Sequence, residues 1–335
     1  MNNKPAPAVV LGTDHPHVYG LARLAQEAPA TELAGVWAHT AEQREQAAER
    51  TGVPTFENLD DALALKPAIV MIGAVPGERA QLAIRALEQG AAALIDKPLA
   101  LTHDDLKQLQ AACEKYGKPV MPYYPFRAYP LVLAAKKLLE DGAIGRLVRI
   151  FAAGPHKLNA PTRPDWHWTR QGNGGALIDI ASHHADLCCW IAGQAPNQII
   201  ATHGNLTQPD HPEFQDFAQA MLRFPDGVFG HIEVDWLNPT SMKNFGDTRF
   251  WFQGATGKIE LRLGDDMSGH LWNDEVAAQP IQPLDSDAHQ WGIKLVQDMV
   301  TGQPTDIPQE QVWLASKVTL VAFDSARQNG KPLAM

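Results

Sequence analysis

Residues 8–20 read AVVLGTDHPHVYG. The apolar run that ends at Gly12 is typical of a buried parallel strand. Val18, Leu21 and Leu24 then recur at helical spacing. A strand, a turn and a helix in this order begin a βαβ unit. Because ligands bind at the carboxyl ends of parallel strands, the turn after Gly12 is the first candidate for a binding site.

The same alternation continues to about residue 122. Each apolar run is followed by a stretch of good helix formers, and Gly90 and Gly117 stand where helices should end. Further strands are expected at 32–38, 68–73, 91–95 and 119–121, with helices at 41–50, 77–89 and 102–116. This pattern predicts an α/β fold whose first domain, residues 1–125, is a doubly wound parallel sheet of the Rossmann type.

The pattern changes at about residue 125, where helices no longer separate the strands. Strands are expected at 147–153, 197–203, 216–224, 228–236, 249–253 and 258–262, with helices at 127–140, 176–190, 288–301 and 309–327. These elements predict that residues 126–335 form an α+β domain with a large, open, mainly antiparallel sheet. Packing of the C-terminal helix back on the first domain stays open as an alternative.

Composition narrows the classes of partner. The net charge of −10 opposes a general role in binding nucleic acid. No apolar run approaches the length of a membrane span, and three cysteines give no disulfide framework. We therefore expect a cytoplasmic protein.

The turn after Gly12 departs from the Gly-x-Gly-x-x-Gly fingerprint of dinucleotide sites, because Asp14 and His17 replace its second and third glycines. The charge of Asp14 opposes a phosphate, and its favoured interpretation is as the N-cap of the following helix. His15 and His17 face either the ligand or solvent. Gly12, Thr13, Asp14, His15 and His17 are the cofactor candidates of this turn.

The end of the second strand bears on the choice between NAD and NADP. A carboxylate there usually binds the ribose of NAD. Here Trp37 and Ala38 lead into His39 and Thr40, without a carboxylate. His39 and Thr40 are therefore cofactor candidates, and NADP is slightly favoured while both forms stay open.

One helix of the second domain carries candidate acid–base chemistry. Asp179, His183 and Asp186 share a face of the helix expected at 176–190. A carboxylate one turn from an imidazole orients it for proton transfer, although such pairs also occur on ordinary helix surfaces. The Gly-rich segment 172–175 just before the helix favours a ligand site, because it allows close approach.

Four motifs resemble the glucose–fructose oxidoreductase/inositol dehydrogenase/MocA (Gfo/Idh/MocA) family. Asp96-Lys97-Pro98 is similar to its Glu-Lys-Pro motif, and Ala74-Val75-Pro76 to the segment before it. Residues 142–146 (GAIGR) and 174–183 (GGALIDIASH) are similar to its later motifs. Stretches such as 245–249 (FGDTR) resemble a bacterial branch of the family.

The resemblance implies hydride transfer between NAD or NADP and a secondary alcohol of a sugar, cyclitol or sugar acid. It gives Lys97 the place beside the nicotinamide and the substrate hydroxyl, His183 the role of base and Asp179 that of orienting it. Ala74, Pro76, Asp96 and Lys97 join the cofactor candidates. Polar and aromatic groups that we expect near the substrate are Tyr124, Arg127, His156, Arg163, Trp166, His167 and Trp236.

Two other functions stay open. A regulator of the same fold would bind a dinucleotide or sugar without turnover, as the altered glycine turn would allow. A metal-assisted lyase or epimerase would use His15, His17, Asp179 and His183, whereas the leading interpretation needs no metal. We also expect a homodimer or homotetramer that associates through the free face of the second sheet, because a large one-sided sheet rarely stays bare.

Overall fold

The computed structural model describes residues 4–264 and 266–335. These fall into two compact units. The first comprises residues up to Tyr123 together with His289–Trp313, and the second comprises Tyr124–Ala288 and Leu314–Met335. The first unit thus includes a C-terminal segment that the sequence-based boundary at residue 125 would assign to the second. Within the described residues, no helix is long and apolar enough to span a membrane.

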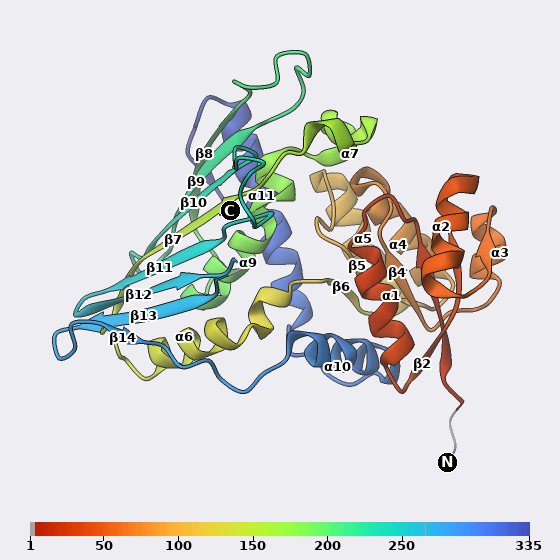
Figure 1. The fold of residues 1–335 in the computed structure, drawn as a ribbon, viewed down its shortest axis with the longest axis horizontal. Helices are drawn as coiled ribbons and strands as arrows, with labels where there is room; N and C mark the ends of the chain where they lie inside the picture. Colours follow the sequence, from red (N-terminus) through yellow and green to blue (C-terminus); the bar gives the residue numbers. More distant parts are fainter. Residues whose placement is uncertain (1–3, 265) are drawn as a thin grey trace. The chain divides into compact units, whose positions relative to one another are not determined.

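The first unit is built on a six-stranded parallel sheet in the order β3-β2-β1-β4-β5-β6. This is the doubly wound order of dinucleotide-binding sheets, so the predicted fold class is confirmed (Figure 1). The strands are β1 (Ala6–Leu11), β2 (Thr31–Trp37), β3 (Thr55–Phe56), β4 (Ile69–Ile72), β5 (Ala92–Ile95) and β6 (Val120–Pro122). The helices are α1 (Val18–Glu27), α2 (Ala41–Thr51), α3 (Leu59–Leu63), η1 (Pro76–Glu78), α4 (Arg79–Glu88) and α5 (His103–Tyr116).

Helix α10 (Ala288–Thr301) brings the C-terminal segment onto α1. A Cβ atom added at Gly292 would lie 2.8 Å from Leu24 Cδ1, so the two helices pack closely there. At the rim of this contact His289 Nε2 lies 2.6 Å from Glu27 Oε2. The two contact partners are separated by most of the chain.

The second unit is built on a nine-stranded sheet in the order β14-β13-β12-β11-β7-β10-β9-β8-β15. Its neighbours pair antiparallel except β7 and β10, which run parallel. The strands are β7 (Leu147–Pro155), β8 (Gln198–Gly204), β9 (Phe217–Arg223), β10 (Phe229–Asp235), β11 (Arg249–Gly254), β12 (Gly257–Arg262), β13 (Ser268–Asn273), β14 (Gln279–Pro280) and β15 (Leu333–Ala334). Sequence patterns miss β13, β14 and β15, of which the last two have only two residues each.

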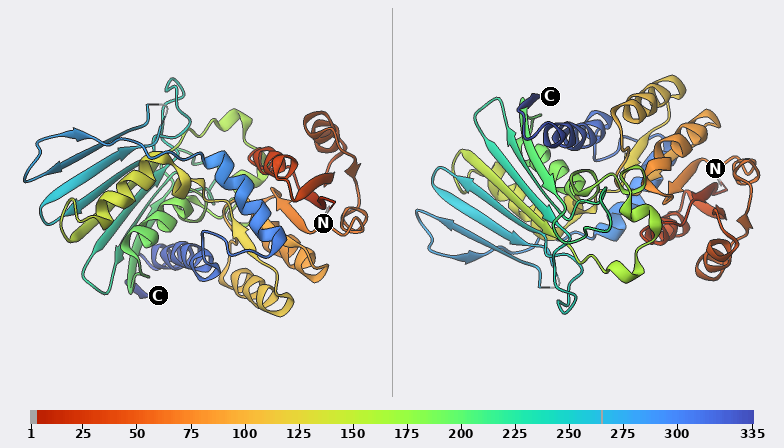
Figure 2. Two further views of the ribbon diagram at one scale, coloured as in Figure 1. Left: turned by 90° about the horizontal axis from the view of Figure 1, so that it is seen from below. Right: turned by 90° about the horizontal axis from the view of Figure 1, so that it is seen from above.

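Helices cover one face of this sheet. The helices of this unit are η2 (Pro125–Ala128), α6 (Pro130–Glu140), η3 (Ala160–Thr162), η4 (Asp165–Trp168), α7 (Arg170–Asn173), α8 (Ala176–Asp179), α9 (Ala181–Ala192) and the later part of α11 (Gln309–Arg327). Of these, α6, α8 and α9 contact the strands directly. Figure 2 shows α6, α9 and α11 on the same side of the strands. The single helix expected at 176–190 is divided at Ile180 into α8 and α9.

Two glycines draw the turn after β1 against the end of β4. Gly12 has φ +76°, and a Cβ there would lie 2.4 Å from Ala74 Cβ. A Cβ on Gly73 would lie 2.2 Å from Val18 Cβ. The backbone N–H of His15 also donates to Gly73 O at 2.9 Å. These close approaches fix where α1 begins and therefore where His15 and His17 stand.

We predict that substitution by alanine changes the free energy of unfolding in opposite directions at two glycines of this unit. Gly73→Ala forces Val18 to move and should lower the free energy of unfolding by about 1–3 kcal/mol. Gly20→Ala, on the exposed side of α1 where nothing lies within 4 Å, should raise it by about 0.5–1 kcal/mol. Urea unfolding of the two variants measures both. Equal effects would contradict the packing described here.

Candidate functional site

The first part of the candidate site is centred on the buried carboxylate of Asp96, just past the end of β5. Asp96 Oδ2 lies 2.9 Å from His15 Nδ1 and 3.2 Å from an Arg79 guanidinium nitrogen. Its other oxygen lies 3.2 Å from His17 Nδ1. We call His15, His17, Arg79 and Asp96 the Asp96 cluster. It joins the turn after β1 to the ends of β4 and β5.

Arg79 supplies the positive charge of this cluster. Burial opposes ionisation of Asp96, but the neighbouring His15 and Arg79 hold the pKa of its carboxyl well below the ordinary value. Burial also lowers the pKa of His15, whereas a guanidinium keeps its charge throughout the working pH range. The permanent cation that balances Asp96 is therefore the guanidinium of Arg79, which has no exposed surface.

Arg79 also fixes the backbone that carries Lys97. Its Nε donates to Ala74 O at 2.8 Å, and one terminal nitrogen donates to both Asp96 O, at 2.9 Å, and Lys97 O. Lys97 is half-buried, and its peptide bond to Pro98 is cis. One side chain of α4 thus holds the segment after β4 and the segment after β5, where Ala74, Asp96 and Lys97 were predicted to bind the cofactor.

His15, His17 and Asp96 also meet the spacing of a metal site, since one ligand atom from each lies within 4.8 Å of the others. Two imidazoles and a carboxylate suit several transition metals. However, Arg79 already neutralises Asp96, and a divalent cation would place a second positive charge beside its guanidinium. We therefore keep the expectation that the cluster works without a metal ion.

Asp14 does not cap α1, which corrects the favoured interpretation of this residue. The residue before α1 is His17, and no side chain caps the helix. Asp14 Oδ1 instead accepts a hydrogen bond from Gln43 Nε2 at 2.9 Å, and Oδ2 lies 3.9 Å from His39 Nε2. The carboxylate is thus drawn towards the beginning of α2.

Gln43 reaches Asp14 because it belongs to a capping box. Thr40 caps α2 by accepting from Gln43 N, while Gln43 Oε1 accepts from Thr40 N. On the other side, His39 Nε2 lies 2.9 Å from Glu78 Oε2 in η1. We call Asp14, His39, Gln43 and Glu78 the β2-end cluster. Thr40 and Pro76 flank it as predicted cofactor residues, whereas sequence patterns gave no sign of Gln43 or Glu78.

The turn also offers a buried hydroxyl that fits a phosphate ligand. Thr13 Oγ1 is buried and has no hydrogen-bond partner among the residues that the structure describes. In a sheet of this topology the turn after β1 is where dinucleotide phosphates bind. A hydroxyl that donates to a phosphate oxygen there removes the cost of an unpaired buried group. Thr13 therefore fits a dinucleotide despite the missing glycines.

The second part of the candidate site lies where α7 meets α8. Asn173 Nδ2 donates to Asp179 Oδ2 at 3.1 Å and lies 3.4 Å from His167 Nδ1. Asn173 Oδ1 accepts from Gly175 N at 3.0 Å. Gly174 and Gly175 have φ of +89° and +87°, which side chains rarely tolerate. The Gly-rich segment thus positions Asn173, which orients Asp179.

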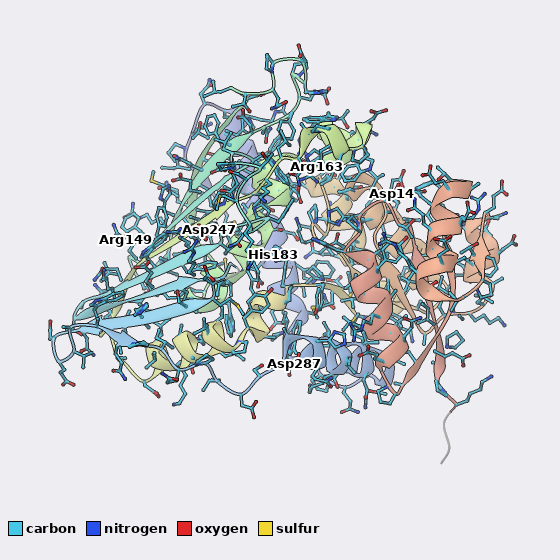
Figure 3. All side chains as sticks on the ribbon, in the orientation of Figure 1. Asp14, Arg149, Arg163, His183, Asp247 and Asp287 are labelled. Atoms are coloured by element: carbon cyan, nitrogen blue, oxygen red, sulfur yellow. The ribbon has the colours of Figure 1, made fainter. Side chains whose placement is uncertain are left out.

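His183 lies on α9 and is labelled in Figure 3, and two aromatic rings from the η2 segment contact its imidazole. The ring of Phe126 lies 4.8 Å from its imidazole and that of Tyr124 lies 5.5 Å away, between ring centres. Tyr124 is buried, and burial raises the pKa of its hydroxyl. Tyr124 therefore shapes the surroundings of His183 as a neutral group.

The substrate candidates fall into two groups by exposure. Tyr124, Arg127, His167 and Trp236 are buried, whereas His156, Arg163 and Trp166 are partly exposed. Arg163 donates to Leu158 O and stacks its guanidinium 4.8 Å from the centre of the Trp236 ring. The rings of His156 and Trp236 are 5.7 Å apart. Arg163, His156 and Trp236 thus form a local aromatic and cationic surface.

Arg127, which was predicted to lie near the substrate, forms a buried ion pair with Asp186. Arg127 Nε donates to Asp186 Oδ2 at 2.8 Å, and a terminal nitrogen donates to Oδ1 at 2.7 Å. Both side chains are buried. This bidentate pair ties η2, which carries Phe126, to α9, which carries His183.

Removing one partner of this buried ion pair should therefore lower the free energy of unfolding. We predict that Arg127→Met lowers the free energy of unfolding by about 3–5 kcal/mol, because Asp186 is left buried and unpaired. Lys137→Met, which removes an exposed pair with Asp141, should cost less than about 0.5 kcal/mol. Chemical denaturation compares them, and the double change Arg127→Met with Asp186→Leu should recover part of the loss. A loss below about 1 kcal/mol in Arg127→Met would contradict the assignment.

Both parts of the chain match models of known protein families. Residues 8–124 match the family model described as an oxidoreductase family with an NAD-binding Rossmann fold. Residues 132–260 match the model of the GFO/IDH/MocA C-terminal domain. Together the two matches cover most of both units.

The relatives include sugar dehydrogenases. The chain is 29% identical to levoglucosan dehydrogenase of Pseudarthrobacter phenanthrenivorans over 54% of its length and 45% of that protein. It is 31% identical to D-apiose dehydrogenase of Paraburkholderia graminis over 52% of its length and 46% of that protein. The chain thus spans about half the length of these curated relatives. A crystal structure from Erwinia carotovora atroseptica, provisionally described as an oxidoreductase, matches with TM-score 0.88 and 26% identity over 96% of this chain and 98% of that one.

Proposed function

Because this chain belongs to the Gfo/Idh/MocA family of NAD-binding oxidoreductases, we propose that it transfers a hydride between a nicotinamide dinucleotide and a secondary alcohol. The alcohol belongs to a sugar, cyclitol or sugar acid. The observation that carries the proposal is Lys97 at the carboxyl end of β5, on a backbone that Arg79 anchors. Ligands bind at this edge of doubly wound sheets.

The residues of the first unit hold the cofactor in this proposal. The Thr13 hydroxyl donates to a phosphate oxygen at the turn after Gly12. When bound, the nicotinamide supplies the hydride acceptor or donor. The ammonium of Lys97 stabilises the negative charge that develops on the substrate oxygen. The Asp96 cluster keeps Lys97 in place through its main chain.

The second unit supplies the proton chemistry. His183 accepts the proton of the substrate hydroxyl in oxidation and returns it in reduction. Phe126 and Tyr124 restrict the orientation of its ring. Asp179, itself oriented by Asn173, orients the base in this proposal. Asp179 is a positioning residue, whereas Lys97 and His183 touch the reacting groups.

The nearby aromatic and cationic surface suits a sugar-like substrate. His156 offers a partly exposed ring for a sugar face, and Arg163 offers donors for hydroxyl or carboxylate oxygens. Trp236 is buried and supports both of these side chains from behind. The free thiols of Cys113, Cys188 and Cys189 support the cytoplasmic location that we also propose.

Substitution of the two reacting groups tests the proposal. A screen of cyclitols, hexoses and uronic acids with NAD⁺ and NADP⁺, followed by absorbance of the reduced nicotinamide, first identifies a substrate. Lys97→Met and His183→Asn should then each lower kcat by about 100-fold or more, which is the usual contribution of such groups. His183→Asn should change dinucleotide affinity by less than about threefold, since His183 acts only in proton transfer.

Lys107→Met, on the exposed side of α5, is the matched control and should keep full activity. Wild-type protein that binds neither dinucleotide would refute the proposal. So would Lys97→Met or His183→Asn variants that turn over like the wild type.

We also propose that the chain forms a homodimer or homotetramer through the bare face of the nine-stranded sheet. Met221, His231, Phe151 and Trp251 are register neighbours across β9, β10, β7 and β11. The ring of Phe151 lies 5.0 Å from those of both His231 and Trp251. Met221 and Phe229 are each about half exposed. An exposed apolar row of this kind is typical of an association surface.

Light scattering on a size-exclusion column tests this association. The wild type should elute as a dimer or tetramer, and Phe229→Glu should shift it towards the monomer because a charge cannot be buried there unpaired. Leu206→Lys, which changes a more exposed residue after β8, should leave the mass unchanged. A monomeric wild type would contradict the proposal.

A further inference from the structure

The end of β2 is where doubly wound sheets distinguish NAD from NADP. The two cofactors differ there by a hydroxyl or a phosphate on the adenosine ribose. The residues directly after β2 carry no carboxylate and slightly favour NADP on sequence grounds. The structure, however, brings two carboxylates to this point from the neighbouring strands β1 and β4. They are Asp14 and Glu78 of the β2-end cluster.

Asp14 is held firmly and keeps an unused acceptor. Only 9% of its side chain is exposed, and Gln43 Nε2 binds one carboxylate oxygen at 2.9 Å. The other oxygen, Oδ2, accepts no hydrogen bond from any residue between 4 and 335 that the structure describes. The partly exposed imidazole of His39 stands over it at 3.9 Å. A buried carboxylate oxygen in this state favours a hydroxyl donor and disfavours a second anion.

Glu78 adds a second negative charge on the other side of His39. Its Oε2 lies 2.9 Å from His39 Nε2, and about half of its side chain is exposed. His39 therefore stands between two carboxylates. Protonation would give it one positive charge, which the carboxylates of Asp14 and Glu78 together exceed. The imidazole is therefore a poor anchor for a ribose phosphate.

The guanidinium of Arg44, which contacts the segment after β2, is already engaged. Arg44 donates to Ala38 O at 3.1 Å and to His39 O at 3.2 Å, and its other terminal nitrogen lies 3.7 Å from Glu57 Oε2. A 2′-phosphate site needs arginine or lysine donors that point at the phosphate. Beyond Trp37, an open cavity of about 570 Å³ is lined by Glu57 and Asp61, which add two more carboxylates.

From these contacts we infer that the site takes NAD and rejects NADP. Asp14 and Glu78 replace the carboxylate that NAD sites usually carry directly after β2. They accept hydrogen bonds from the ribose diol and repel a 2′-phosphate. The inference rests on the proposed function, because it concerns the same dinucleotide. Repulsion between two carboxylates and a phosphate a few ångströms away corresponds to binding of NAD about 100-fold or more tighter than that of NADP.

Equilibrium titration with NAD⁺ and NADP⁺, with tryptophan fluorescence as the readout, tests the inference without any turnover. The wild type should bind NAD⁺ at least about 100-fold more tightly than NADP⁺. The double variant Asp14→Asn with Glu78→Gln should reduce this ratio to about tenfold or less, because both changes keep the size of the side chain and remove its charge. Glu49→Gln removes one carboxylate charge from an exposed part of α2 and should leave the ratio unchanged.

A salt series supports the test should the double variant unfold. In the wild type, a rise from about 0.05 to 0.5 M NaCl should narrow the NAD⁺ preference by screening the repulsion of the 2′-phosphate. Equal or tighter binding of NADP⁺ would overturn this inference and leave the proposed function standing. A ratio of NAD⁺ to NADP⁺ affinity that changes neither in the double variant nor with salt would also overturn the inference and leave the proposed function standing. Binding of neither dinucleotide would overturn both.

Discussion

The buried ion pair between Arg79 and Asp96 is the interaction on which the first part of the site depends. A carboxylate in the interior is stable only with a cation and hydrogen bonds to compensate its lost hydration. Arg79 provides both, and its remaining donors bind the carbonyls of Ala74, Asp96 and Lys97. The same pair therefore neutralises Asp96, gives His15 and His17 a partner, and sets the main chain of Lys97.

This arrangement explains how the turn after β1 tolerates the loss of two fingerprint glycines. The two side chains that replace these glycines, Asp14 and His17, point towards different partners. His17 is drawn to Asp96, whereas Asp14 is drawn to Gln43 and lies beside His39. Gly12 alone keeps the close approach to Ala74 that the topology needs. The negative charge of Asp14 thus lies towards the ribose end of β2, where a hydroxyl can use it.

Local patterns predicted the parallel sheet, most strands of the large sheet, and Asp179 and His183 as residues to inspect, whereas Lys97 followed from the resemblance to the family. They failed wherever a side chain is positioned by a distant one. Arg79, Glu78 and Asn173 went unnoticed because ordinary residues at helix ends acquire a role only through partners elsewhere in the fold. Arg127 and Asp186 were assigned separately to substrate and helix face, although they bind each other across 59 residues. The segment 289–313 returned to the first unit for the same reason.

Transfer of deuterium tests the central claim most directly. The protein is incubated in ordinary water with reduced dinucleotide that carries deuterium at both hydrogen positions of nicotinamide C4, and with keto forms of cyclitols, hexoses and uronic acids. Since a hydride passes between carbons without exchange with water, the account predicts an alcohol product that carries the deuterium on the carbon of the new hydroxyl. An alcohol product without deuterium, or no product from any member of the panel despite bound dinucleotide, would contradict it.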